Sequence, residues 1–321
     1  MQILVTGGAG FIGAHLCERL IRDGHHVTVL DNFSTGRRRN LDKLQGNPGF
    51  KLLEGSILDS RMLDHLVKSS DYVFHLAAAV GVFNIVNNPL ASLLTNIRGT
   101  ENVLEAAHAS NVPVFLTSSS EVYGKNVSDS LKESDDRVLG SPVTLRWSYS
   151  EAKAIDESLA YAYFIEKKLE TRIVRFFNTV GPRQLGAYGM VVPRFVKAAL
   201  TNEPITIFGD GTQTRCFAHV YDVVDAVIAI AFAQNTIGKV INIGNDFEIS
   251  INDLAKRIIG ETGSQSEIVY VPYDEAYGEG FEDMERRVPN IDLIRDLVGW
   301  QPKRDLSTMI ADISSEMQKT L

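Results

Sequence analysis

Ile3-Leu4-Val5-Thr6-Gly7-Gly8-Ala9-Gly10-Phe11-Ile12-Gly13 is the stretch near the start of the chain that decides its fold. The apolar run before the glycines predicts a strand, and the apolar residues after them recur at helical spacing. Gly7, Gly10 and Gly13 permit a tight turn, a close approach of a pyrophosphate to backbone N–H groups, and close packing of the helix on the strand. The stretch therefore predicts a dinucleotide-binding turn.

The residues that follow alternate apolar runs with helical patterns, which is typical of βαβ units and a parallel sheet. We expect an α/β fold, a Rossmann-type doubly wound parallel sheet with a smaller C-terminal α/β lobe for the substrate. The dinucleotide-binding domain is predicted over residues 1–177 and the second lobe over 178–321, with Val240 to Ile243 returning to the main sheet. The other predicted strands are Ile3 to Thr6, Val27 to Asp31, Lys51 to Glu54, Tyr72 to Leu76, Val114 to Ser118 and Thr171 to Phe176.

Composition narrows the range of partners. The formal net charge is -8, from 32 Lys and Arg against 40 Asp and Glu, so the protein has no overall positive field to attract nucleic acid. Cys17 and Cys216 are too few for a disulfide framework or a cysteine metal site. No apolar run reaches the roughly 18 residues of a membrane span. We expect a cytoplasmic protein without metal, nucleic acid or membrane segment.

The choice of cofactor depends on Asp31, the last residue of the second predicted strand. A carboxylate there accepts hydrogen bonds from an adenosine ribose and repels a ribose 2′-phosphate, which favours NAD over NADP. The arginines Arg37, Arg38 and Arg39 are the opposing signal, because a nearby arginine accommodates that phosphate. We interpret the pattern as an NAD site.

Tyr149 and Lys153 are four residues apart and share one face of a predicted helix. A neighbouring ammonium and an oxidised nicotinamide ring both favour the phenolate of Tyr149, which would take a hydroxyl proton while hydride leaves the same carbon. Ser118, Ser119, Ser120 and Glu121 follow a buried strand, at the sheet edge where ligands bind. The alternative is a polar loop that caps its own backbone.

Taken together, these motifs resemble the extended short-chain dehydrogenase/reductases that act on nucleotide-sugars. The resemblance also includes His75-Leu76-Ala77-Ala78, Asn96 with Gly99-Thr100, and Arg175-Phe176-Phe177-Asn178. It implies oxidation of C4 of a hexose through a transient 4-keto intermediate, with Ser119 and Tyr149 at the C4 hydroxyl and Lys153 on the nicotinamide ribose. It also implies a homodimer.

The resemblance also implies the rest of the site. The cofactor-binding set is Gly7, Gly10, Phe11, Ile12, Gly13, Asp31, Asn32, Ser34, Thr35, Gly36, Ser56, Ile57, Leu76, Ala77, Ala78, Asn96, Tyr149 and Lys153. The catalytic set is Tyr149, Lys153, Ser119, Ser120 and Glu121, and the substrate side comprises Ser119, Glu121, Asn178, Val192, Arg215 and Arg287. Arg287 is alternatively a solvated surface ion, Arg183 and Arg194 are weaker candidates, and His75 is read as a strand-end histidine rather than a base.

The pair Ser120-Glu121 separates the branches of this family. Hexose 4-epimerases usually lack a carboxylate at the position of Glu121, and dTDP-glucose 4,6-dehydratases carry Asp-Glu, whereas Ser-Glu is similar to UDP-glucuronate decarboxylases and GDP-mannose 4,6-dehydratases. Arg146-Trp147-Ser148-Tyr149 and the segment from Gly278-Glu279-Gly280 to Arg287 and Pro289 resemble the decarboxylases. We therefore favour UDP-glucuronate decarboxylation. A 4-epimerase, a 4,6-dehydratase and a non-catalytic NAD-binding regulator are the alternatives.

Asp31→Ala tests the choice of cofactor. The substitution removes both the acceptor for the ribose hydroxyls and the repulsion of a phosphate, so NAD binding should weaken about tenfold or more while tolerance of NADP improves. Titration of each cofactor into the purified protein measures both effects. Equal use of NAD and NADP by the unsubstituted protein would contradict the interpretation.

Overall fold

The computed structural model describes residues 1–81, 85, 87–186, 190–272, 275, 284 and 286–319. Its main sheet has seven parallel strands in the order β11-β6-β5-β4-β1-β2-β3. The strands are β1 (Gln2–Thr6), β2 (His26–Asp31), β3 (Phe50–Glu54), β4 (Tyr72–His75), β5 (Val114–Ser119), β6 (Thr171–Phe176) and β11 (Val240–Ile243). Each predicted strand is found within one residue of its expected ends, and the Rossmann-type fold class is confirmed.

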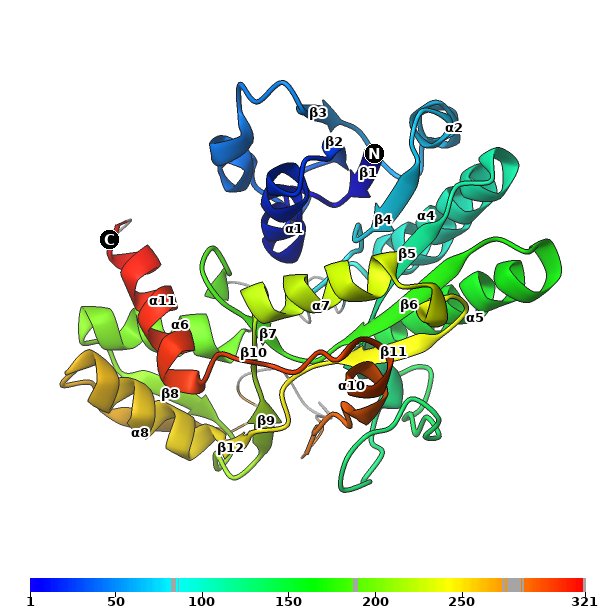
Figure 1. Ribbon diagram of the computed structural model, residues 1–321. Coiled ribbons are helices and arrows are strands. Elements are labelled where there is room, and N and C mark those ends of the chain that lie inside the picture. Colours follow the sequence, from blue (N-terminus) through cyan, green and yellow to red (C-terminus); the bar gives the residue numbers. More distant parts are fainter. Residues whose placement is uncertain are drawn as a thin grey trace.

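Helices cover both faces of this sheet (Figure 1). One apolar core joins the sheet to α1 (Phe11–Arg22), α7 (Val220–Phe232) and α10 (Asp292–Val298). The core on the opposite face joins it to α2 (Ser60–Lys68), α4 (Pro89–Ser110) and α5 (Ser148–Lys167). Short 3-10 helices are η1 (Arg38–Leu44), η2 (Ser120–Tyr123), η3 (Leu145–Trp147) and η5 (Gln234–Thr236). Because the sheet is covered on both faces, nearly all residues of its central strands β1, β4 and β5 are buried.

A second lobe, with its own apolar core, lies beside the carboxyl ends of the strands (Figure 1). Its helices are α6 (Val191–Thr201), α8 (Ile251–Thr262) and α11 (Leu306–Gln318). Small sheets complete it, pairing β8 (Ile205–Phe208) with β13 (Ile268–Val271), β9 (Thr214–Cys216) with β12 (Glu248–Ser250), and β7 (Thr179–Val180) with β10 (Ala218–His219). The chain returns from this lobe to the main sheet: β11 pairs with β6, and α7 and α10 pack on the sheet. The division at residue 177 stays a prediction.

The helix α5 is fixed to the sheet by a buried ion pair. Arg175 on β6 donates from Nε to Glu157 Oε1 at 2.9 Å and from Nη2 to Glu157 Oε2 at 2.7 Å. Such a two-pronged contact restrains both position and rotation. Side chains on the first turns of α5 are therefore held above the carboxyl end of β5.

The described residues give observations on disulfides, metal sites and membrane spans. Cys17 and Cys216 are both free and buried. No group of three or more His, Cys, Asp or Glu in the described part of the chain is arranged to hold a metal ion. None of its helices combines the length and the apolar character needed to cross a bilayer.

Candidate active site

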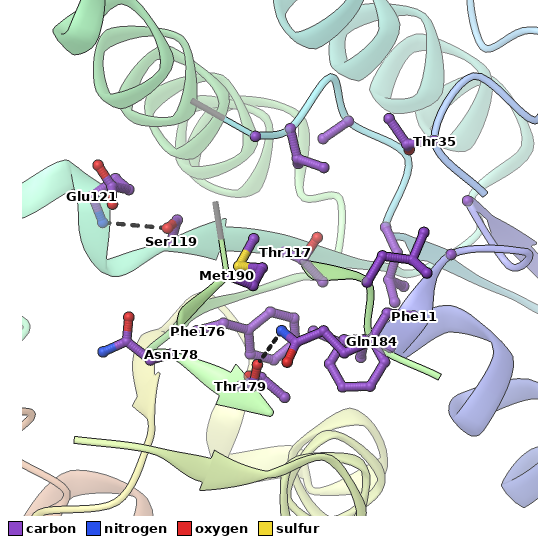
Figure 2. Close-up of a pocket in the computed structure, with 18 of the residues that line it drawn as sticks. Phe11, Thr35, Thr117, Ser119, Glu121, Phe176, Asn178, Thr179, Gln184 and Met190 are labelled. Carbon is purple, nitrogen blue, oxygen red and sulfur yellow. Dashed lines mark hydrogen bonds between the residues drawn. The ribbon is translucent and has the colours of Figure 1, made fainter. Parts of the chain in front are cut away.

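A cavity of about 520 Å³ lies where the carboxyl ends of the main strands face the second lobe. Residues from β2, β5 and β6 line one side, and residues from α6, β8 and β9 line the other. Figure 2 shows Thr117, Ser119 and Glu121 on one ribbon at the cavity, with Phe176, Asn178 and Thr179 on the neighbouring one. This is the edge at which open α/β sheets bind ligands.

The glycine turn at one end of the cavity has no room for side chains. Gly7 has φ +73°, and a Cβ there would lie 2.6 Å from the backbone nitrogen of Ala77. A Cβ on Gly13 would lie 2.4 Å from the carbonyl oxygen of Gly7. At the start of α1, Gly10 offers no side-chain cap and the first turn holds no acidic residue, so the helix N-terminus can receive an anion. The turn therefore fits the pyrophosphate of a dinucleotide.

Asp31 lies buried at the end of β2 and lines the cavity. Its Oδ1 accepts from the Phe33 N–H at 2.8 Å and its Oδ2 from the Ala9 N–H at 2.9 Å, which leaves each oxygen a lone pair for a ribose hydroxyl. Burial raises the pKa of Asp31. Arg38 pairs with Glu54 and lies 4.2 Å from the centre of the Phe33 ring. Of the three arginines that favoured NADP in the sequence, Arg38 is thus already paired with a carboxylate.

The structure brings most of the predicted cofactor residues to the cavity, and three lie outside its lining. A Cβ on Gly36 would lie 3.0 Å from the Asp31 carboxylate, so this glycine makes room for the acid. The Ser56 hydroxyl accepts from the Leu58 N–H at 3.2 Å. Asn96 accepts from the Ala79 N–H at 2.7 Å and shapes the loop after β4. The cavity is lined by the predicted residues Gly7, Gly10, Phe11, Ile12, Gly13, Asp31, Asn32, Ser34, Thr35, Ile57, Leu76, Ala77, Ala78, Tyr149 and Lys153.

Tyr149, at the start of α5, faces the cavity beside Ser119. Burial raises the pKa of the Tyr149 phenol well above its ordinary value, the charges of Glu121 and Asp156 raise it further, and a hydrogen bond with the Ser119 side chain opposes the rise. We expected the Lys153 ammonium and an oxidised nicotinamide ring together to favour the phenolate, and that expectation stays a prediction for the protein with its cofactor. The ammonium donates to the Thr117 carbonyl and to Asp156 Oδ2, each at 3.1 Å.

Glu121 is held between two buried arginines. Its Oε2 accepts from Arg146 Nη1 at 2.5 Å and its Oε1 from Arg287 Nη1 at 2.8 Å, while Arg287 also donates to the Ser120 hydroxyl at 3.2 Å. Burial alone would raise the pKa of Glu121, but Arg287 and Arg146 outweigh it and lower the pKa to about 2. Glu121 therefore stays ionised at neutral pH and is a weak base.

These contacts also settle the place of Arg287, which is buried at the site, so the reading of it as a solvated surface ion is wrong. Gly278, Glu279 and Gly280, part of the segment compared with decarboxylases, lie outside the described residues. Arg146 was not predicted as a site residue. The sequence feature that could have identified it is its position in the stretch Arg146-Trp147-Ser148-Tyr149, three residues before the predicted catalytic tyrosine.

The second lobe supplies the remaining predicted substrate residues. Arg215 on β9 is buried at the cavity and donates from Nη1 to the Thr214 carbonyl at 2.8 Å. Asn178 donates to the Cys216 carbonyl at 3.0 Å, and Val192 is buried in the wall. Gln184, Phe208 and Gln213 also line the cavity, and sequence reasoning missed them because no recognisable motif marks these positions.

Arg183 links the second lobe to the cofactor helix. It has φ 71°, and it donates to Glu18 Oε1 at 2.6 Å, to the Asn40 carbonyl at 2.7 Å and to His15 Nδ1 at 2.6 Å. Burial and Arg183 lower the pKa of His15 to about 3, so this ring is neutral and its Nδ1 accepts. Glu18 and His15 both belong to α1. The weaker candidate Arg183 thus braces the cavity wall.

His75 lies beneath the site rather than in it. The ring contacts the Thr6 hydroxyl at 2.7 Å and the Thr100 hydroxyl at 3.1 Å. Burial and the charge of Lys153 lower its pKa to about 3, so it is neutral. It occupies the strand end as a buried histidine with polar partners.

Comparison with known proteins gives consistent relatives. Residues 3–244 match the family described as NAD dependent epimerase/dehydratase. The UDP-N-acetyl-alpha-D-glucosaminuronate decarboxylase of Bacillus cytotoxicus is 42% identical over 94% of this chain and 92% of its own length, and UDP-glucuronic acid decarboxylase 1 of Xenopus tropicalis is 37% identical over 94% and 68%. The crystal structure of UDP-glucuronic acid 4-epimerase from Bacillus cereus, with UDP-glucuronic acid and NAD, superposes with a TM-score of 0.90 at 29% identity, covering 100% of both chains.

Glu121→Gln should destabilise the protein, because two buried arginines lose their counter-charge. We expect the free energy of unfolding at pH 7 to fall by about 3 kcal/mol. The pKa of Glu121 drops on folding from its ordinary 4.5 to about 2, so its contribution is complete above pH 4.5 and is lost as the pH falls toward 2.

Urea unfolding at pH 7 and at pH 4 measures both effects. The difference in the free energy of unfolding between the unsubstituted protein and Glu121→Gln should be smaller at pH 4. Glu105→Gln, at an exposed position on α4, is the matched control and should change little. A difference that does not depend on pH would contradict the ion-pair argument.

Proposed function

Because the chain belongs to the NAD dependent epimerase/dehydratase family, we propose that it decarboxylates a UDP-uronate with NAD as its cofactor. The glycine turn and Asp31 fit the dinucleotide, and the similarity to two decarboxylases covers 94% of the chain. The most informative observation is a pair of buried arginines that line the cavity.

These arginines, Arg146 and Arg287, flank Glu121, and ion pairs of 2.5 Å and 2.8 Å link the three side chains. The side chains of Arg146, Glu121 and Arg287 are 6%, 16% and 8% exposed, so water screens their charges weakly. A substrate carboxylate is an acceptor suited to these guanidinium groups, whereas the neutral hexose of UDP-glucose offers them no such charge.

The chemistry follows from placing the C4 hydroxyl of the sugar beside Ser119 and Tyr149. NAD supplies the acceptor for the hydride of C4 and returns that hydride at the end of the cycle. Tyr149 takes the hydroxyl proton, and Ser119 orients the oxygen. The resulting ketone is β to the C6 carboxylate, so the C5–C6 bond breaks, carbon dioxide leaves, and the electron pair is delocalised into the ketone as an enolate.

The enolate then takes a proton from solvent water at C5, and the ketone oxygen receives back from Tyr149 the proton of the original C4 hydroxyl as C4 is reduced. Arg146 and Arg287 hold the carboxylate end of the substrate against the edge of the site. Arg215 is placed to offset the diphosphate charge, a task suited to a planar group with several donors. Lys153 is positioned for the nicotinamide ribose.

Label released from C6 tests the proposal directly. We expect UDP-glucuronate, or its 2-acetamido counterpart, labelled with carbon-14 at C6 to yield labelled carbon dioxide and a UDP-pentose. UDP-glucose and GDP-mannose should yield no product. If the label stays in the sugar while C4 inverts, the protein is a 4-epimerase. Loss of water from a neutral hexose would identify a 4,6-dehydratase, and NAD binding without any turnover would identify a non-catalytic regulator.

Tyr149→Phe gives this assay its internal control. Removing a positioned acid/base should reduce turnover about a hundredfold or more, with the fold and NAD binding retained. Tyr161→Phe, at an exposed position on the same helix, should behave as the unsubstituted enzyme.

A homodimer that pairs α4 and α5 with their copies is also proposed. The two helices pack against each other on one face of the sheet (Figure 1), and their outer surfaces expose Leu90, Ile155, Tyr161 and Ile165. Light scattering should give a mass of two chains, and Tyr161→Glu together with Ile165→Glu should give one. A monomer in the unsubstituted protein would refute the pairing.

A cytoplasmic location remains part of the proposal and is supported by the two free, buried thiols.

A further inference from the structure

Lys153 is bonded to a buried carboxylate that the proposed chemistry does not use. Asp156 lies one turn further along α5, and its Oδ2 accepts from Lys153 Nζ at 3.1 Å. The side chain of Asp156 is 0% exposed and that of Lys153 is 2% exposed. Two opposite charges that are this close and this well shielded from solvent interact much more strongly than a surface pair.

The groups around Asp156 come from each element packed against it. Burial raises the pKa of Asp156, the Lys153 ammonium and the Thr100 hydroxyl on α4 oppose that rise, and Glu157 adds to it. On the far side of Thr100, His75 on β4 is neutral. Glu157 is itself paired with Arg175 on β6. Lys153 is therefore the cation to which Asp156 is bonded within the described chain.

This pairing changes what Lys153 does to its neighbour. An unpaired ammonium beside a buried phenol would favour the phenolate. Here Asp156 offsets that charge, and its own charge is one of the causes that raise the pKa of Tyr149. Burial and Glu121 raise that pKa more than Asp156 does, and the three together keep the phenol protonated until a further positive charge enters the cavity.

We propose that Asp156 is a positioning residue which fixes Lys153, offsets its charge, and so contributes to keeping Tyr149 protonated unless the positive ring of the oxidised cofactor lies beside it. The consequence for turnover rests on the proposed function. Tyr149 would give up its proton only with oxidised cofactor in place, and would hold that proton while the cofactor is reduced. It is then ready to protonate the C4 oxygen in the final reduction, which closes the cycle before the 4-keto sugar escapes.

Asp156→Asn tests this inference, because it preserves the shape of the side chain and removes its charge. In the NAD-loaded protein we expect the ionisation of Tyr149 to move down by about one pH unit. Tyrosinate absorbance, corrected with Tyr149→Phe, reports this without substrate, and the acid limb of the kcat/KM profile should move by the same amount. Glu166→Gln removes one charge from an exposed position on the same helix and should move neither.

With UDP-uronate, Asp156→Asn should also release more 4-keto pentose per turnover and accumulate more reduced nicotinamide, measured by its near-ultraviolet absorbance. If Tyr149 titrates as in the unsubstituted protein, the inference is overturned, whatever the activity. If the titration moves but no carbon dioxide is formed from any uronate, the proposed function fails while the role of Asp156 stands.

Thr100→Val keeps the test decisive should Asp156→Asn not fold. It removes the hydroxyl that stabilises the carboxylate while leaving the carboxylate in place. The pKa of Asp156 should rise, its negative charge should diminish, and the Tyr149 titration should move in the same direction by a smaller amount. An unchanged titration in Thr100→Val, with thermal stability near that of the unsubstituted protein, would equally overturn the inference.

Discussion

The chain passes from β1 into α1 through a turn in which three backbone segments meet without side chains between them. A methyl group on Gly7 would overlap the backbone at Ala77, and one on Gly13 would overlap the carbonyl of Gly7. This contact sets the distance between β1, β4 and α1, and so the position of the helix N-terminus that faces the cavity. The turn thus defines where a ligand lies, and the remaining strand ends bring their side chains to it.

Much of this arrangement was predictable because buried parallel strands have a simple pattern. Thr171 to Phe176 and Val240 to Ile243 were predicted with their exact ends, since each is a short apolar run bounded by turn residues. Tyr149, Lys153 and Ser119 were found as candidates because strand ends and helix spacing place them together. The cofactor-binding role of Asn96 stays a prediction: the residue lies on α4, outside the lining of the cavity, and its amide oxygen accepts from the Ala79 N–H.

What sequence reasoning could not supply was the pairing of charges. Glu121 was identified from its place in a motif, but its protonation state depends on Arg146 and Arg287, which approach it from different parts of the chain. Likewise, the spacing of Tyr149 and Lys153 predicts a lowered phenol pKa, whereas burial, Glu121 and Asp156 together raise it in the protein without cofactor. A motif specifies which groups are present, whereas their electrostatics depend on every charge within a few ångströms.

The contacts of Arg183 bear on how the molecule moves. This residue belongs to the cavity wall contributed by the second lobe, yet its partners His15, Glu18 and Asn40 are on or beside the cofactor helix. Separating the two units at this point breaks three short polar contacts together and leaves a guanidinium without its acceptors. A hinge motion that opens the cavity at this point is therefore energetically costly. Small molecules are expected to enter through an opening of fixed width, without a rotation of one lobe away from the other.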